Sequence, residues 1–451
     1  MQTNNTLKLI AAMALFSSLP FAAHAQRIWD GETDGDWQEA TNWDGNTTIP
    51  SSGNALQFGA ATTYAVINSP STNFGTLRFL STAGANYSLS GNTTNNEIYG
   101  TVTVEGSASA TNHTINNRFR LNNKTFDIQS TSTSLTLNNF DYGGSSRTLT
   151  KNGDGTLILT NNATNPGELK LNGGTVDYQN NVGTGNGRLH INGSNSSAVV
   201  TNSTGTSRTL HFGYQDGTVS ASFAGSITGN LNVNNGRTSV SASGINQTFT
   251  GTSASTYTGT TGLNAGTWTL NGTHTGGDNY TISGGTDNSG TLAGSGSIVL
   301  ADNTKTFSFT GASGQLAALN PGESGTDTST LTLGSGSIDT VVNLNDFSEL
   351  RVDIGGGTAS DRLDIFGDLN LDPGSSLNLL SLGGAWDGST YTVATFSNLS
   401  GTFGTVNGLD SGYQVNYGSN DITLSVIPEP STLVLIGIAL ASLGLLRRRK
   451  R

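Results

Sequence analysis

The sequence predicts an all-β solenoid, in which short strands stack coil upon coil. The 451-residue chain holds 61 glycines, no cysteine and 11% charged residues, against roughly 25% charged residues in an ordinary domain. Abundant glycine and few charges disfavour helices. Alternating strand patterns and an internal repeat favour stacked strands over a disordered, glycosylated stalk. Without cysteine, neither disulfides nor cysteine-ligated metals are expected.

Short alternating runs recur from about residue 60 to residue 427. Residues 101–104 (TVTV), 134–137 (SLTL), 156–159 (TLIL) and 330–333 (TLTL) have the period of half-buried strands. Pairs such as Asn-Gly and Asp-Gly separate these runs, and they permit positive φ angles at turns. Strands this short, at such close intervals, fit a coiled sheet better than a sandwich.

An internal repeat indicates that one coil is the structural unit. Residues 171–176 (LNGGTV) match residues 263–268 (LNAGTW) at an offset of 92. We interpret this unit as the end of one strand, a corner with asparagine and glycine, and the start of the next strand. Stacked copies would let an asparagine amide bond its counterpart in the next coil. Stability would then come from contacts between neighbouring coils.

The segment 149–176 resembles the passenger-associated repeat, also called the autotransporter-associated β-strand repeat. It starts with the pattern Lys151-x-Gly-x-Gly-Thr-Leu and ends with Leu-Asn-x-Gly-Thr. Residues 257–270 repeat the later half, whereas residues 165–167 (NPG) replace the more usual Tyr-Thr-Gly in the first copy. The clear matches cover about residues 150–300. The resemblance implies a right-handed parallel β-helix.

Residues 1–25 are predicted to be a secretory signal peptide. Lys8 supplies a positive charge, an apolar stretch of eleven residues follows it, and Ala23 and Ala25 give a small-x-small cleavage pattern before Gln26. The mature chain would begin at Gln26 after transport by the general secretion machinery. The alternatives are a buried N-terminal helix and a retained membrane anchor, for which the apolar run is short.

Three of the five tryptophans lie in a short segment near this expected start, at Trp29, Trp37 and Trp43. We expect their rings to fill a cap over the first coil, where sheet edges would otherwise be exposed. A surface on which sugars stack is the alternative. The Trp-rich segment 27–58 is similar to the opening of many exported bacterial proteins with autotransporter-associated repeats.

An acidic segment, residues 30–36 (DGETDGD), partly fits the first positions of a calcium-binding loop. Thr41 stands where such a loop has its bidentate glutamate, and Trp37 lies inside the loop. A solvated acidic turn is therefore expected. No metal and no cofactor are predicted for the chain.

The last 24 residues contain three features in a fixed order: a Pro-Glu-Pro motif, an apolar run and a basic cluster. These are Pro428, Glu429 and Pro430; residues 433–446; and Arg447, Arg448, Arg449, Lys450 and Arg451. The apolar run of 14 residues is shorter than the ~20 residues that usually span a bilayer, but local thinning allows a short span. We expect one transmembrane helix, with its basic end in the cytoplasm as a membrane stop.

This arrangement resembles the PEP-CTERM sorting signal over residues 428–451. The resemblance implies processing by an exosortase, a membrane-embedded transpeptidase-like enzyme of Gram-negative bacteria. It also implies delivery to the cell surface or to an extracellular polysaccharide matrix. Pro428, Glu429 and Pro430 would then be a processing motif for another enzyme. A generic C-terminal tail anchor is the alternative.

The charges and polar groups of the mature chain indicate what it binds. Residues 26–427 carry 14 basic and 30 acidic side chains, a net charge of −16, which disfavours nucleic acid as a partner. The histidines are scattered, and Asp361 and Asp364 should point to opposite faces of a strand. Catalysis is not expected. A structural or adhesive role with exopolysaccharide or biofilm is favoured over a carbohydrate-binding or polysaccharide-degrading β-helix protein.

The predicted organisation has five parts. They are a signal peptide (1–25), a Trp-containing cap with the first coils (26–105), β-helix repeats (106–334), C-terminal coils with an aromatic cap (335–427), and the sorting and anchor segment (428–451).

Overall fold

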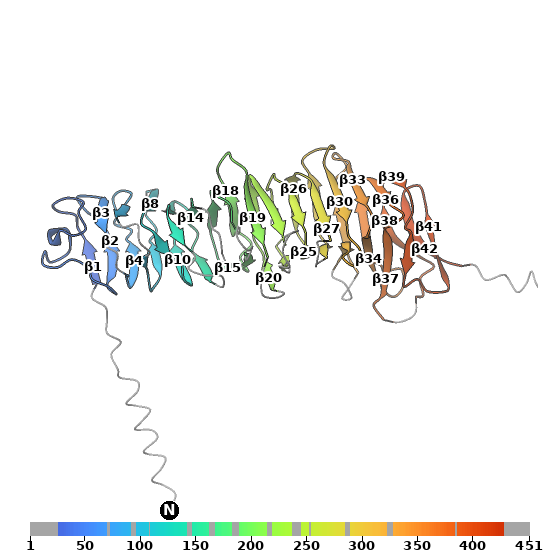
Figure 1. Ribbon diagram of the computed structural model, residues 1–451, viewed down its shortest axis with the longest axis horizontal. Helices are drawn as coiled ribbons and strands as arrows, with labels where there is room; N and C mark the ends of the chain where they lie inside the picture. Colours follow the sequence, from blue (N-terminus) through green and yellow to red (C-terminus); the bar gives the residue numbers. More distant parts are fainter. Residues whose placement is uncertain are drawn as a thin grey trace, which may run out of the picture. The chain divides into compact units, whose positions relative to one another are not determined.

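The computed structural model describes residues 26–427 apart from short internal segments. These segments are residues 70–72, 92–95, 108, 142–146, 162–166, 183–188, 214–218, 237–244, 252–253, 285–288, 323–327 and 384–385. The described residues form an all-β parallel β-solenoid of about 13 turns with almost no helix (Figure 1). The solenoid prediction is therefore confirmed. The expected signal peptide and C-terminal helix lie outside the described residues.

The chain forms two compact units. Among the described residues, unit 1 comprises residues 26–141 and 149–158, and unit 2 comprises residues 147–148 and 159–427. Within each unit the chain passes from one sheet to the next at corners and returns one coil later.

Unit 1 has three sheets, whose order follows the chain coil by coil. The first contains β1 (Gln26–Trp29), β2 (Ala55–Phe58), β4 (Thr76–Phe79), β7 (Val102–Val104), β10 (Lys124–Ile128) and β13 (Thr148–Asn152). The second contains β3 (Ala65–Ser69), β5 (Ser88–Gly91), β8 (Thr111–Ile115), β11 (Thr133–Leu137) and β14 (Thr156–Leu159). The third, a sheet of very short strands, contains β6 (Asn96–Glu97), β9 (Phe119–Arg120) and β12 (Phe140–Asp141). A 3-10 turn, η1 (Ala40–Asn42), precedes β2.

Unit 2 begins with shorter strand groups and continues with three long sheets. The groups are β15 (Glu168–Leu171) with β17 (His190–Asn192), and β16 (Thr175–Tyr178) with β18 (Val199–Asn202) and β21 (Ser226–Gly229). One long sheet contains β19 (Arg208–Phe212), β22 (Leu231–Asn235), β24 (Thr261–Leu263), β27 (Tyr280–Ser283), β30 (Thr306–Thr310), β33 (Thr340–Leu344), β36 (Gly367–Leu371) and β39 (Asn398–Ser400).

The other two long sheets of unit 2 run through the same coils. One contains β20 (Ser220–Phe223), β23 (Asn246–Phe249), β25 (Gly266–Leu270), β28 (Gly290–Gly294), β31 (Ala317–Pro321), β34 (Ser348–Ile354), β37 (Ser376–Ser381) and β40 (Thr405–Asn407). The last contains β26 (Thr273–Gly277), β29 (Ser297–Leu300), β32 (Thr330–Leu333), β35 (Arg362–Ile365), β38 (Thr390–Thr395), β42 (Asp421–Val426) and β41 (Tyr413–Tyr417). The pairs β38–β42 and β41–β42 are antiparallel, so the final strands turn back on the last coil.

The core of each unit is built from inward columns of apolar side chains. In unit 1, Leu56, Leu77, Val102 and Phe126 are paired in register from strand to strand, and all four are buried. The intervening residues face outward, as the period of two in the sequence predicts. Burial of such columns between coils supplies most of the stability of a stacked sheet.

The Trp-rich segment forms the predicted cap at the start of unit 1. Trp29, Trp37 and Trp43 are at most 1% exposed. The Trp43 ring centroid lies 5.1 Å from that of Trp29 and 4.7 Å from that of Trp37. Backbone bonds join Asp44 to Ile28 of β1 and Trp37 to Ile67 of β3, so the segment covers both sheet edges. The sugar-stacking alternative is wrong, because the three rings are buried.

The acidic segment beside this cap is a turn organised around one buried asparagine. Asn42 accepts hydrogen bonds from the backbone of Thr33 (2.9 Å) and Asp34 (3.1 Å), and its amide donates to the Asp34 carboxylate (2.8 Å). The Asp34 carboxylate also accepts from the backbone N–H of Asp36 (2.8 Å). The two bonds to the Asp34 carboxylate hold its pKa below the usual value, and the bond from Asp36 has the larger effect.

Both repeated segments run from one strand, through a corner, into the next strand. Residues 171–176 run from the end of β15 into β16, and residues 263–268 run from the end of β24 into β25. Gly174 and Gly266, which match in the repeat, have φ angles of 65° and 71°, a conformation that favours glycine. The predicted interpretation of the repeat as a strand, a corner and a strand is therefore confirmed.

Asparagine amides pair between coils, as the sequence predicts. In unit 1, the amide of Asn138 donates to the side-chain oxygen of Asn116 (2.6 Å). In unit 2, Asn370 on β36 donates to Asn343 on β33 (2.9 Å). These bonds satisfy amide groups along the stacking direction without any charge.

Lys151, the first residue of the repeat pattern, points into the core of unit 1 and is fully buried. Its ammonium group donates to the carbonyl oxygens of Asn152 and Gly153, each at 2.8 Å. Burial lowers its pKa to about 8. The lysine side chain thus stabilises, from inside the core, the turn that directly follows it in the chain.

The last coil of unit 2 carries the predicted aromatic group. Trp386 lies 5.8 Å from Tyr391 and 5.2 Å from Tyr413 between ring centroids. The Tyr413 hydroxyl donates to the carbonyl oxygen of Gly388 (2.6 Å). Ring packing and the antiparallel strands together finish the core at this end of the unit.

Candidate binding face

The residues predicted to direct export and sorting lie mostly outside the described part of the chain. Gln26 is exposed and begins β1. Ala23 and Ala25, the Pro428-Glu429-Pro430 motif and the basic cluster 447–451 lie outside the described residues. The described chain ends at Val426, the last residue of β42, and Ile427, which are 45% and 44% exposed.

Polar side chains gather on the outer face of the short third sheet of unit 1. Glu97 pairs in register with Arg120, and Arg120 pairs with Asp141, so the three form one outward column across β6, β9 and β12. Ile98, Phe119 and Phe140 alternate with them and point into the core. We define the β6–β9–β12 face by its outward residues, which are Glu97, Tyr99, Arg118, Arg120, Asn122 and Asp141.

The two arginines of this face lie at long distances from its carboxylates. Arg120 Nη1 lies 3.5 Å from Glu97 Oε1, and Arg118 Nη2 lies 3.7 Å from Asp141 Oδ2. The Asn122 amide donates to Glu97 Oε1 at 2.8 Å. Both ion-pair distances exceed the ~2.7–2.9 Å of a charge-assisted hydrogen bond. The two guanidinium groups therefore keep donors that these carboxylates do not take up.

Tyr99 is the most exposed of the large apolar and aromatic side chains in the described residues, at 60%. It lies two positions after Glu97, so both side chains project from the same face. Its hydroxyl oxygen accepts a hydrogen bond from the Asn73 amide of the preceding coil (2.8 Å), and Asn73 also accepts from the backbone N–H of Glu97 (2.9 Å). The ring is thus held beside the charged column with its surface open.

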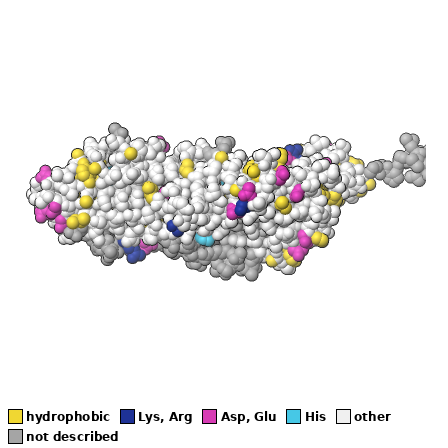
Figure 2. Space-filling view, turned by 90° about the horizontal axis from the view of Figure 1, so that it is seen from above, with side chains coloured by type: hydrophobic (Ala, Val, Ile, Leu, Met, Phe, Trp, Pro, Cys, Tyr) yellow, Lys and Arg dark blue, Asp and Glu magenta, His cyan; other side chains and the backbone are white. Residues whose placement is uncertain are grey.

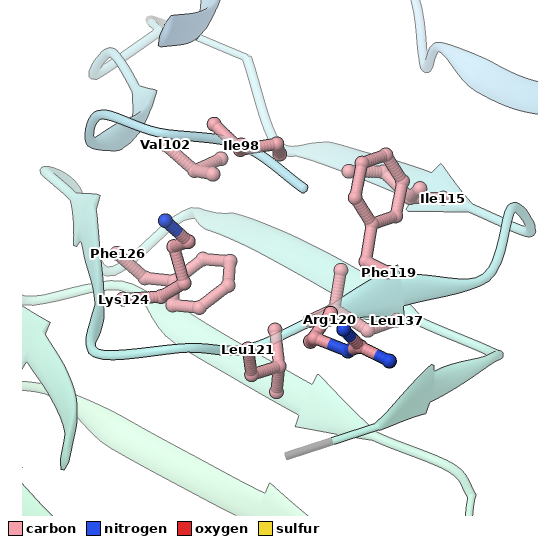
Figure 3. Close-up of a pocket in the computed structure, with 9 residues that line it drawn as sticks. All are labelled: Ile98, Val102, Ile115, Phe119, Arg120, Leu121, Lys124, Phe126 and Leu137. Carbon is pink, nitrogen blue, oxygen red and sulfur yellow. The ribbon is translucent and has the colours of Figure 1, made fainter. Parts of the chain in front are cut away.

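A small cavity of about 10 Å³ lies beneath this face. Its wall is mainly apolar and also contains Lys124 and Arg120, which Figure 3 shows on opposite sides of the cavity. Lys124 is 6% exposed, and its burial lowers its pKa, while the nearby charge of Glu97 raises it. Buried Nε of Arg120 has no hydrogen-bond partner among the described residues. The positive charges of Lys124 and Arg120 therefore lie next to apolar side chains, where solvent screens their electrostatic interactions weakly.

A second polar cluster lies wholly inside unit 2. The Tyr257 hydroxyl bonds the hydroxyls of Thr261 (2.7 Å) and Tyr280 (3.0 Å), and the Tyr280 hydroxyl bonds His274 Nδ1. His274 Nε2 lies 2.9 Å from the carbonyl oxygen of Tyr257. A carbonyl only accepts, so Nε2 carries the hydrogen and Nδ1 accepts from Tyr280.

Burial shifts the pKa values of the titratable side chains in this cluster. Desolvation lowers the pKa of His274 to about 4, raises the pKa of Tyr257 to about 12 and raises that of Tyr280 well above its usual value. The four side chains are at most 2% exposed. The cluster is therefore neutral near pH 7 and closed to a polymer, and its bonds serve to order the core.

The predicted acidic pair in the C-terminal coils is separated as expected. Asp361 is buried and accepts hydrogen bonds from the backbone N–H groups of Ser329 (2.8 Å) and Asp353 (3.0 Å). Asp364 faces outward, and both its oxygens lie 2.7 Å from Arg362 nitrogens. Each carboxylate therefore has its own structural role, and the two do not form one site.

The described residues contain neither a metal-binding cluster nor a helix that could cross a membrane. No group of three or more histidine, aspartate or glutamate side chains within them is arranged to hold a metal ion. The same part of the chain contains no helix that is long and apolar enough to cross a bilayer.

Comparison with known families identifies the sorting signal. Residues 426–450 match the family model of the PEP-CTERM protein-sorting motif. The motif implies an exported protein that is anchored in the membrane and then sorted by an exosortase. No curated protein matches the chain. The chain is thus a β-solenoid followed by a sorting signal that begins at the last residue of β42.

Sequence reasoning did not single out the β6–β9–β12 face. The sequence signal that could have indicated this face is a group of three basic residues close together in an acidic chain: Arg118, Arg120 and Lys124. Their neighbours Glu97 and Asp141 are 23 and 21 residues from Arg120, so only the coil register brings them together.

Proposed function

We propose that this exported, exosortase-sorted β-solenoid has a structural or adhesive role at the cell surface or in the extracellular matrix, in association with exopolysaccharide. The sorting motif at 426–450 supports the destination. The extended stacked sheets support the role, because they offer the same polar groups again and again along each unit.

The observation that carries the proposal is an outward column of neutral polar side chains in unit 2. Register pairs connect it from β22 to β39. Its members are Asn234, Thr281, Ser308, Asn343, Asn370 and Ser400, and Gly262 occupies the register position between Asn234 and Thr281. Neighbouring strands are ~4.8 Å apart. Amide and hydroxyl groups at that spacing can donate to and accept from the hydroxyls of a polymer along its length.

Figure 2 shows the same character over the face that it presents. Most of that surface belongs neither to charged nor to hydrophobic side chains, and the charged groups stand in small separate patches. A surface of this kind favours many weak hydrogen bonds over one strong site.

Cosedimentation tests the polysaccharide association directly. The full chain in mild detergent is mixed with the extracellular polysaccharide of its own bacterium and centrifuged, with free polysaccharide length measured in parallel. We expect the protein in the pellet and an unchanged polymer length. Shortening of the polymer would overturn the structural role in favour of a degrading enzyme, and protein that stays in solution would overturn the association.

Replacement of Pro428, Glu429 and Pro430 by alanine tests the sorting step. We expect an unprocessed, membrane-retained chain, because the processing motif is lost while the apolar run and basic cluster remain. The matched control replaces Ser431 and Thr432 by alanine. Processing of the triple variant at the normal rate would contradict the proposal.

A further inference from the structure

The β6–β9–β12 face is less negative than the rest of this acidic molecule. Residues 26–427 carry 30 acidic and 14 basic side chains, and three of the basic ones, Arg118, Arg120 and Lys124, fall within seven positions. Two carboxylates, those of Glu97 and Asp141, stand beside them. The outward side chains of the face, two arginines and two carboxylates, have a formal charge of zero, and Lys124 lies buried beneath them; residues 26–427 have a formal charge of −16. An anionic polymer repelled elsewhere would therefore be tolerated here.

The arginines of this face differ from an arginine used for structure. In unit 2, Arg362 holds both oxygens of Asp364 at 2.7 Å, a closed bidentate pair. Arg118 and Arg120 stand 3.7 and 3.5 Å from their carboxylates. Their side chains are 44% and 37% exposed. Planar guanidinium donors that remain accessible suit a carboxylate ligand.

Tyr99 supplies an exposed aromatic ring on the same face, two register positions from Arg120. Its ring is 60% exposed and is held through its hydroxyl by Asn73. An exposed aromatic face packs well against the C–H side of a pyranose ring. Successive coils are ~4.8 Å apart, close to the length of one sugar residue in an extended chain, so neighbouring sugars would meet successive coils.

We propose that the β6–β9–β12 face is a binding site for a uronic-acid-containing polysaccharide. The proposal rests on the proposed association with exopolysaccharide and names the class of polymer and the place of contact. One sugar ring stacks on Tyr99, and the carboxylates of the sugars that follow it pair with Arg120 and Arg118 of the next coil. The carboxylates of Glu97 and Asp141 accept hydrogen bonds from sugar hydroxyls.

Calorimetry with defined oligosaccharides tests this site. The probes are hexamers of galacturonate, mannuronate and glucuronate, with cellohexaose as the neutral comparison, titrated into the full chain in mild detergent. We expect binding of at least one uronate hexamer and much weaker binding of cellohexaose. Tyr99→Ala and Arg118→Gln should each weaken the uronate interaction by about tenfold. Raising the salt concentration from 50 to 500 mM, roughly, should weaken it further, because both partners are charged.

Matched variants separate the site from the rest of the surface. Arg78→Gln removes an exposed arginine that pairs with Glu105 on the first sheet of unit 1. Phe347→Ala removes an exposed ring of unit 2. Both should bind as the unaltered chain does.

Three results would overturn the site, and each leaves the proposed function separately testable. Unchanged affinity in Tyr99→Ala and Arg118→Gln would place the contact elsewhere. Equal affinity for cellohexaose would remove the role of the carboxylate. Failure of all three uronate hexamers to bind would also reject the site, while cosedimentation with the native matrix would still decide the broader association.

Discussion

Each unit buries one histidine almost completely, but the two histidines are held in different ways. His113 of unit 1 stacks on Phe79, with ring centroids 4.4 Å apart, and accepts one hydrogen bond from the backbone N–H of Tyr87 (3.1 Å). His274 of unit 2 stacks on Tyr257 at 3.9 Å and also uses both ring nitrogens, toward Tyr280 and the Tyr257 carbonyl.

The difference shows two means of ordering a solenoid core. In unit 1 the histidine continues a group of rings that includes Trp37, Trp43, Phe58 and Phe79. Stacked rings gain from burial and tolerate small shifts. In unit 2 the histidine is one member of a hydrogen-bonded chain, and a buried member left without its partner costs free energy. Unit 1 thus depends on ring packing here, and unit 2 on complete hydrogen bonding.

Acid should affect both units, because the two histidines share one feature, burial. Desolvation lowers the pKa of each to about 4, below the ~6.5 of an exposed histidine. The unfolded chain therefore binds protons first, so their stabilisation is fully present above about pH 6.5 and is lost towards pH 4.

We expect a loss of about 3 kcal/mol per histidine over that range. The measurement is the free energy of unfolding in urea at several pH values, followed by circular dichroism. A chain with both His113→Phe and His274→Phe is the control and should lose markedly less stability in acid. Equal acid sensitivity of the double variant and the unaltered chain would reject this account.

Removal of one cap ring tests the dependence of unit 1 on aromatic packing. Trp43→Ala deletes a fully buried ring that contacts Trp29, Trp37 and Phe58. We expect unit 1 to lose about 4 kcal/mol of unfolding free energy. The matched change in unit 2 is Trp386→Ala, at a half-buried ring, which should cost about half as much. The comparison fails if both changes cost the same.

Phenylalanine at the two histidine positions tests the comparison itself at neutral pH. His274→Phe leaves the Tyr280 hydroxyl and the Tyr257 carbonyl without their partner and should cost about 3 kcal/mol. His113→Phe leaves one backbone N–H and keeps the ring stack, so it should cost about 1 kcal/mol. Urea unfolding of the single variants gives the values. A double-mutant cycle of His274→Phe with Tyr280→Phe should show coupling, and its absence would mean that the two side chains act independently.

The smallest expected effect concerns the outward asparagine pairs. Asn370→Ala removes the 2.9 Å bond to Asn343 on a half-buried surface of unit 2 and should cost about 0.5 kcal/mol. Asn407→Ala, at an exposed position on β40, is the control. A loss above about 2 kcal/mol would show that these ladders, and not the interior, hold unit 2 together.

Local sequence patterns predicted much of the fold for a physical reason. In residues 156–159 and 330–333 every second side chain is large and apolar, and β14 and β32 occupy those residues. Gly174 and Gly266 mark corners because their φ angles are positive. These features depend on residues that are adjacent in the chain, so their pattern is visible before folding.

The buried cluster and the candidate binding face depend on something else. Tyr257, His274 and Tyr280 come from three different strands or corners, and no local pattern shows that they meet. Tyr99 and Glu97 share a face by alternation alone, but the pairing of Glu97 with Arg120 requires the register of β6 on β9. Coil length sets that register, and it varies from one coil to the next.

The sequence by itself determined the class of fold and the sorting signal, because alternation, corner glycines and the motif at 426–450 are all local. It also determined that the Trp-rich segment would be set apart. Only the tertiary structure decided which side chains stand together, including the histidine cluster inside unit 2 and the Tyr99 and arginine group on unit 1. The stability of a solenoid comes from contacts between neighbouring coils. Those contacts depend on the strand register between coils, which cannot be determined from any single stretch of sequence.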